Sequence, residues 1–446
     1  MRVLSLLLVF ICAILMFLVR REYKLAIIFM STVLLTLVPI GSISATTALI
    51  LFFWLSELRN IKIHWKRLLN SVLLPFAVLS LLTFLISAIT SKNLHSFSSL
   101  VHFGLSEVIT KQFAVLYGFI ALRKLKSIKP LLLVSFVSLI ILTLFAFSNF
   151  ISGESAVVNE FYKETLVDYD FISASRFRVQ ATFVNPFDYG YICVLLALLH
   201  LYGGMTGLES FSMMIVAELC CLFGVVTCNC RTIIFCYLLC MVVYYSAMQR
   251  NHQKKLILLL SIVMVFGIAQ FIPSIKQILD YTFTIFNTSS QVQGSSLGMR
   301  MVQLATVLNY MRGHFLFGRG IYFFNLDLGW ENGSILAADS DLFGLEGIYL
   351  NLLLERGIIG FLIYLASIFL LFRFIIRYRK LGRRIFALGL SLLVLYVAFS
   401  FMTGELLSTT PTYLIIGYVI AVLRNRRLII ERRRKQYVHI KKESGL

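Results

Sequence analysis

Long apolar runs separated by short basic clusters set the pattern of this chain. Runs of roughly 20 apolar residues match the length that crosses a bilayer as an α-helix, and a helix satisfies all its backbone hydrogen bonds internally. Barrel strands would instead alternate polar and apolar residues over about ten positions. The pattern predicts about 12–13 spans, near residues 3–19, 25–41, 44–58, 70–90, 102–122, 130–150, 187–203, 211–228, 232–248, 256–272, 349–372, 385–402 and 408–423. We therefore expect an all-α polytopic membrane protein, with residues 1–446 forming a single integral membrane domain.

The basic clusters predict the orientation of these spans. Six clusters hold 29 Lys and Arg residues, at 20–24, 59–67, 123–129, 250–255, 373–384 and 424–442. The loops that alternate with them hold only nine. Since basic residues accumulate in cytoplasmic segments, we expect the basic tail 424–446 on the cytoplasmic side of the membrane.

Composition excludes two other classes of protein. Hydrophobic residues make up 59% of the chain and charged residues 14%. A soluble domain could not bury so much apolar surface away from water. A net charge of +20 is also typical of nucleic-acid binding, but here the charge lies between apolar runs. We expect the lipid bilayer, and no nucleic acid, as a partner.

Two long segments are predicted on the outer side, at about 151–186 and 273–348. Loops of this length in a compact protein usually carry function or are disordered, and their aromatic and glycine content makes disorder the poorer interpretation. The second loop continues into a water-compatible stretch, 295–361, with a Phe-Gly-Arg-Gly turn at 317–320. Apolar positions within 297–311 predict an amphipathic helix near the membrane interface. We expect the chemistry here.

Outer arginines are the strongest candidates for binding a substrate. Arg176 and Arg178 stand two residues apart, and guanidinium groups bind phosphate oxygens bidentately at any working pH. These arginines suit a pyrophosphate clamp, or they pair with acidic residues of their own loop. Arg231, at a helix start, suits the same anion or lipid headgroups. The second loop adds Arg300, Arg312 and Arg319; Arg319 stands between two glycines whose backbone freedom lets it turn toward a ligand, although single loop arginines are usually solvated.

Carboxylates supply the candidate base. Glu346 stands just before the chain re-enters the membrane, where it could accept a proton from a sugar hydroxyl; pairing with a loop arginine or capping a helix are equally good interpretations, and Asp339 and Asp341 compete for the role. Within the membrane, Glu107 and Lys111 are spaced i, i+4 and can neutralise each other.

The eight cysteines, including Cys228-Asn-Cys230, lack metal-ligand spacing, and no phosphate-cradling glycine loop is present. We expect neither a metal nor another cofactor.

Three motifs, in order, resemble the O-antigen polymerase and O-antigen ligase superfamily of bacterial membrane glycosyltransferases. The first is Arg178 ahead of a Thr-Phe-x-Asn-Pro-x-x-x-Gly helix entry at 182–190. The second is the helix-initiating pair Arg231-Thr232. The third is an outer loop with Arg300, the turn at 317–320, and Tyr-Leu-x-x-Leu-x-Glu-x-Gly-Ile-Ile-Gly at 349–360. The similarity spans roughly residues 170–365.

The resemblance implies a reaction at the outer leaflet. A growing glycan would move from undecaprenyl pyrophosphate to a lipid-linked repeat unit, with Arg176, Arg178, Arg231, Arg300 and Arg319 holding the leaving pyrophosphate. A protein that regulates chain length belongs to the same expectation. Ligase-like members carry His-Asn ahead of the Tyr-Leu pair, where this chain has Glu346-Gly347. This departure favours the polymerase branch and leaves Glu346 as the hypothetical base. Arg300 is the second catalytic candidate.

Three alternatives remain at this level. A ligase would pass the finished glycan to a lipid A core. A polysaccharide flippase or other transporter would concentrate charge at mid-membrane and keep its loops short, whereas this chain does the opposite. A scaffolding membrane protein would leave the outer arginines without an explanation.

Overall fold

The computed structural model describes residues 2–40, 43–60, 63–64, 68, 71, 73–122, 124–162, 178–249, 280, 282–286, 297–329, 342, 345, 347–402 and 409–443. These residues are almost entirely helical. The helices are α1 Arg2–Leu18, α2 Arg21–Leu34, α3 Ala45–Glu57, α5 Leu73–Thr90, α6 Phe97–Phe103, the π-helix η3 Gly104–Gln112, α7 Ala114–Ala121, α8 Lys129–Ser152, α9 Ala156–Tyr162, α11 Pro186–Thr206, α12 Phe211–Thr227, α13 Arg231–Met248, α16 Leu297–Tyr310, the π-helix η6 Phe323–Asp327, α18 Ile348–Arg377, α19 Arg383–Met402 and α20 Thr409–Glu443. Short 3₁₀ turns are η1 Leu58–Asn60, η2 Lys92–Leu94, η4 Leu125–Ile128, η5 Thr284–Phe286 and η8 Arg379–Leu381. The strands β1 Pro39–Ile40 and β2 Ile43–Ser44 have two residues each and pair antiparallel.

Long apolar helices confirm an all-α polytopic membrane protein. Within the described part of the chain, six helices are long and apolar enough to cross a bilayer: Leu73–Thr90, Leu125–Ser152, Pro186–Thr206, Arg231–Met248, Ile348–Arg377 and Arg383–Phe401. Two further apolar helices, Val3–Leu18 and Phe211–Thr227, are shorter.

The remaining expected spans fall on less regular elements. The run at 25–41 stops being helical at Leu34 and ends in the β1–β2 hairpin. The run at 102–122 is divided among α6, the π-helix η3 and α7. The run at 44–58 is the 13-residue α3, and the run at 408–423 is the start of α20, which continues into the basic tail. The expected span 256–272 lies outside the described residues.

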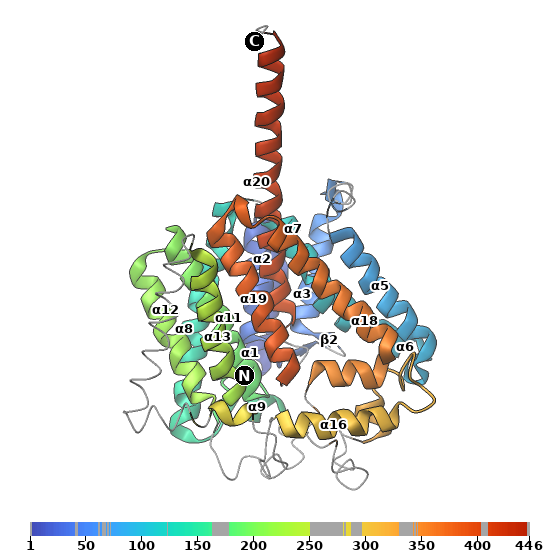
Figure 1. Ribbon diagram of the computed structural model, residues 1–446. Helices are drawn as coiled ribbons and strands as arrows, with labels where there is room; N and C mark the ends of the chain where they lie inside the picture. Colours follow the sequence, from blue (N-terminus) through green and yellow to red (C-terminus); the bar gives the residue numbers. More distant parts are fainter. Residues whose placement is uncertain are drawn as a thin grey trace.

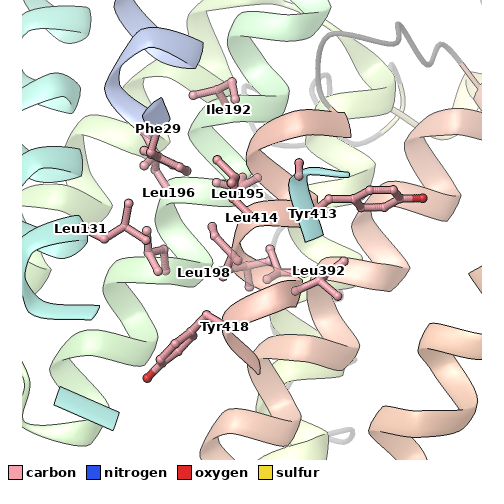
Figure 2. Close-up of a cluster of buried hydrophobic side chains, with 14 of the residues drawn as sticks. Phe29, Leu131, Ile192, Leu195, Leu196, Leu198, Leu392, Tyr413, Leu414 and Tyr418 are labelled. Atoms are coloured by element: carbon pink, nitrogen blue, oxygen red, sulfur yellow. The ribbon is translucent and has the colours of Figure 1, made fainter. Parts of the chain in front are cut away.

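Helix α11 forms the centre of the bundle. Asn185 caps its start by accepting a hydrogen bond at Oδ1 from the Phe187 N–H, 2.9 Å away, with Pro186 at the first helical position, which is where proline fits a helix. Side chains from five helices meet around it (Figure 2), with residues of α2, α8, α19 and α20 against α11. Because lipid is as apolar as this core, close packing rather than water exclusion holds such helices together.

The two ends of the bundle differ. Helix α20 extends well beyond one end, whereas α16 lies across the opposite end, roughly perpendicular to the bundle helices (Figure 1). Helix α9 lies toward the same end as α16. The described part of the second expected outer loop, around α16, is therefore at the end of the bundle opposite the one from which α20 extends.

Candidate functional site

A break in α18 is the main irregularity of the site. Gly357 has φ 63° and ψ −169° inside the apolar helix, so the backbone groups on either side lose their helical partners. The segment 315–320 replaces them. The N–H groups of Arg319 and Gly320 donate to the carbonyls of Leu354 and Glu355, at 2.8 and 2.9 Å. Non-helical backbone at membrane depth is tolerated only where protein satisfies it in this way.

The second side of the break is bound in the same manner. Ile358 and Ile359 donate their N–H groups to the carbonyls of Phe315 and Leu316, at 3.0 and 3.2 Å. Four backbone hydrogen bonds therefore join the loop to the broken helix. The Phe-Gly-Arg-Gly turn and the Glu-Arg-Gly step, far apart in sequence, form one structural unit.

Two glycines make this close approach sterically feasible. A Cβ on Gly357 would lie 2.4 Å from the Leu316 carbonyl oxygen and 2.5 Å from the Gly318 nitrogen. A Cβ on Gly318, whose φ is 72°, would lie 2.5 Å from the Gly357 nitrogen. Positive φ is readily available only to glycine, so both the backbone conformation and the contact require glycine at the two positions.

A buried ion cluster lies beside the break. Glu107, on the π-helix η3, forms an ion pair with Lys111, as the i, i+4 spacing predicts, and its other oxygen lies 3.5 Å from Nη2 of Arg356. Arg356 is 6% exposed, and its guanidinium lies 5.6 Å from the centroid of the Phe103 ring. π-Helical segments and helix breaks often mark functional sites, and this ion pair links one to the other.

The segment after the turn is fixed by polar contacts. Tyr322, at a left-handed φ of 64°, donates its N–H to Oε1 of Glu355 at 3.0 Å. Ile321 donates its N–H to Ser91 Oγ at 2.8 Å. Burial, reinforced by the charges of Glu107 and Glu355, raises the pKa of the Tyr322 phenol to about 12. The phenol therefore stays protonated at any physiological pH. In this neutral form its O–H can donate a hydrogen bond and its oxygen can accept one.

Helix α16 confirms the helix predicted at 297–311. Its buried face carries Arg300 and Gln303, whereas Met301 and Leu308 of the predicted apolar stripe are exposed. Arg300 is only 4% exposed, and its Nη1 donates to Gln303 Oε1 at 2.5 Å. The helix thus turns its arginine toward the protein and its apolar stripe outward, as expected for a helix at a membrane interface.

The structure places Arg319 in the same unit as the break. Its Nε donates to the Tyr310 carbonyl at the end of α16, 2.6 Å away, and its guanidinium lies 5.7 Å from the centroid of the Phe323 ring. An apolar cluster beneath it joins α16 to α18 through Val307, Met311 and Leu354. Arg319 therefore turns inward, as the flanking glycines suggest, and in doing so it ties the turn to α16.

Arg231 and Arg178 lie on neighbouring elements. Arg231 begins α13, and its Nη1 donates to Oγ1 of Thr284 at 2.6 Å, in η5, which contacts α16. Arg178 lies 5.5 Å from the centroid of the Phe187 ring at the start of α11. The next residue, Val179, donates its N–H to the carbonyl of Thr227, the last residue of α12.

Four of the predicted site residues are thereby located. Arg300 lies on α16, Arg319 contacts the end of α16, and Arg231 contacts the neighbouring η5 through Thr284. Arg178 lies at the start of α11, beside the end of α12. Arg176 and Glu346 lie outside the described residues, as do Asp339 and Asp341. The sequence analysis did not single out Arg356, Ser91 or the role of Gly357. A charged Glu-Arg-Gly step within an apolar run was the available signal.

Comparison with known families gives one match. Residues 216–365 match the model of the family described as O-antigen ligase. No curated protein matches the chain. The matched range includes Arg231, Arg300 and Arg319 and the break in α18, and it stops before α19. Over this range the chain is similar to the O-antigen ligase family, and the match supports an enzyme in general.

Proposed function

We propose that this protein is a polysaccharide repeat-unit polymerase. It transfers a growing glycan from undecaprenyl pyrophosphate to a lipid-linked repeat unit at the outer face of the bacterial inner membrane, with the C-terminal tail in the cytoplasm. The observation that carries the proposal is the unit formed by α16, the glycine turn and the broken α18, which lies at the bundle end far from the basic tail. In this unit Arg319 is held at the end of α16, and Arg300 lies on the buried face of the same helix.

The proposed reaction needs an anion site and a proton acceptor. The acceptor hydroxyl oxygen attacks the anomeric carbon of the donor glycan, the bond from that carbon to the pyrophosphate oxygen breaks, and its electron pair leaves with the lipid diphosphate. The hydroxyl proton passes to a carboxylate, for which Glu346 is the candidate. Positioning the two substrates and stabilising the departing charge supply most of the catalysis in such a step.

Arginines would stabilise the departing charge. Arg300 is the main candidate because its guanidinium is nearly buried, and charges interact more strongly away from water. Arg176, Arg178, Arg231 and Arg319 complete the proposed pyrophosphate site. Gln303 holds Nη1 of Arg300 and would fix the orientation of the planar guanidinium group.

An O-antigen ligase is the second candidate, favoured by the description of the matched family. It would use the same donor and the same leaving group, and differ in the acceptor, a lipid A core. The arginine site suits both reactions equally. The acceptor side separates them, and there Glu346-Gly347 in place of His-Asn favours the polymerase.

Surface glycolipid from a deletion strain tests the proposal directly. Loss of a polymerase leaves a single repeat unit on the core, whereas loss of a ligase or a flippase leaves none. The single-repeat band is the expected result, and a core without any repeat would overturn the polymerase assignment.

Complementation of that strain tests the site. Arg300→Ala should abolish the ladder while the protein still reaches the membrane, because losing one contact to a developing charge typically costs about 10²–10³ in rate. Arg312→Ala is the matched control, since Arg312 follows α16 but is exposed. Arg300→Lys keeps the charge without the planar fork and should restore only part of the ladder. An undiminished ladder with Arg300→Ala would remove Arg300 from the site.

A further inference from the structure

A cationic cavity lies at the other end of α18. It has a volume of about 250 Å³ and is lined mainly by residues from the last turns of α18 and the middle of α20. Its lining residues are Ser71, Leu370, Arg373, Phe374, Arg377, Tyr378, Arg424 and Arg427. Four of the eight are arginines, and none carries a carboxylate. A cavity of this charge favours an anion.

Helical spacing produces this concentration of charge. Leu370, Arg373, Phe374, Arg377 and Tyr378 follow the i, i+3, i+4, i+7, i+8 pattern that defines one helix face. Arg424 and Arg427 are three residues apart on α20, and side chains at that spacing are neighbours. The two faces meet across the cavity, so the first arginines of the clusters at 373–384 and 424–442 converge in space.

Aromatic rings and a backbone contact hold the arginines in place. The guanidinium groups of Arg377 and Arg427 lie 5.9 and 5.3 Å from the centroid of the Tyr378 ring, and Arg427 also donates to the Tyr378 hydroxyl. Arg424 lies 5.4 Å from the centroid of the Phe119 ring. The neighbouring Arg426 donates to the Leu381 carbonyl at 2.9 Å, which joins α20 to the turn after α18. Cation–π contacts orient guanidinium groups without neutralising their charge.

The position of the cavity suits a lipid. The helix from 358 to 377 rises about 30 Å at 1.5 Å per residue, which is the thickness of the hydrocarbon core. The residues of α18 that line the cavity therefore lie toward the other end of this helix from the break at Gly357. Leu370 and Phe374 give it an apolar wall, and α18 presents the exposed apolar side chains of Leu362 and Phe369 nearby, where acyl chains can lie.

We propose that this cavity binds the phosphate headgroup of an anionic glycerophospholipid. Guanidinium groups match phosphate geometry, and basic pockets between membrane helices on the cytoplasmic side are suited to anionic headgroups. The site is independent of the glycan-transfer site, and its occupant would fix the angle between α18 and α20.

Lipid binding to the purified full-length protein in detergent tests this inference. Native mass spectrometry titrations would compare phosphatidylglycerol, zwitterionic phosphatidylethanolamine and inorganic phosphate. We expect phosphatidylglycerol to bind at least tenfold more tightly than phosphatidylethanolamine, and millimolar inorganic phosphate not to displace it. Equal binding of the two lipids, or displacement by free phosphate, would overturn the assignment to a lipid.

Matched variants separate the cavity from general surface charge. Arg377→Gln/Arg427→Gln should raise the dissociation constant for phosphatidylglycerol at least tenfold. Arg379→Gln/Arg383→Gln removes the same charge at neighbouring exposed positions that do not line the cavity and should leave binding unchanged. Arg373→Gln, a single change at an exposed lining residue, serves if the double variant fails to fold and should weaken binding in the same direction. Equal losses in the lining and control variants would show only surface attraction and refute the site.

Discussion

Gly357→Ala should detach the glycine turn from the broken helix. The added methyl group would lie 2.4 Å from the Leu316 carbonyl oxygen and 2.5 Å from the Gly318 nitrogen. Both atoms belong to backbone, so no side-chain rotation can relieve the contact. Either α18 or the segment 315–320 must move, and any such movement strains the four hydrogen bonds across the break.

The expected loss of stability has two parts. A non-glycine residue at the φ and ψ of Gly357 stores about 1–3 kcal/mol of backbone strain. Each hydrogen bond that joins the turn to the break contributes about 0.5–1.5 kcal/mol net, so complete detachment adds roughly 2–6 kcal/mol for the four bonds. The hydrogen-bond part applies in full only if the turn leaves the break entirely, whereas the backbone strain applies in either case.

Gly313→Ala is the matched control because it isolates the strain. Gly313 lies in the segment before the turn with a φ of 79°, and a Cβ there would have nothing within 4 Å. Thermal unfolding in detergent, followed by size-exclusion fluorescence, would compare the two variants, together with limited proteolysis of the segment 313–320. We expect Gly357→Ala to unfold several degrees below Gly313→Ala and to be cleaved faster.

The double variant Gly318→Ala/Gly357→Ala adds a sharper criterion. Both single changes disturb the same contact, so their effects should not add, as is usual for residues in contact. If Gly357→Ala matched Gly313→Ala in both unfolding temperature and cleavage rate, the inference that the two segments form one tightly fitted unit would be wrong.

The ion cluster and the topology yield the remaining predictions. Glu107→Gln leaves the buried Arg356 and the half-buried Lys111 without the Glu107 carboxylate and should cost about 3–5 kcal/mol. Glu107→Gln/Arg356→Met should recover part of this loss in thermal unfolding, and a double variant as unstable as the two losses combined would contradict the pairing. Ser91→Ala removes the acceptor for the Ile321 N–H and should cost about 1–3 kcal/mol in the same assay, with Ser98→Ala, at an exposed position of α6, as control. A green fluorescent protein fused after Leu446 should fluoresce and an alkaline phosphatase fused there should be inactive; the reverse pattern would place the tail outside.

Periodicity and charge were enough to predict several features of this molecule. Apolar runs predicted the long helices because a span must be apolar and helical regardless of its neighbours. The i, i+4 spacing predicted the Glu107–Lys111 pair, and the helical periodicity of apolar residues at 297–311 predicted α16. The sequence also indicated the arginine at the start of α13 and the glycine turn as parts of a candidate site, but not their contacts.

Tertiary structure decided the features that join distant segments. The pattern of 349–372 reads as one continuous span, and only the insertion of residues 315–320 explains why it breaks at Gly357. Arg356 pairs with Glu107 across 249 positions, and the arginines of 373–377 and 424–427, interpreted only as orientation signals, converge on one cavity. Local sequence determines which segments are helical because helix formation depends on neighbouring residues. It does not determine which helices meet, since those contacts arise only when the bundle packs.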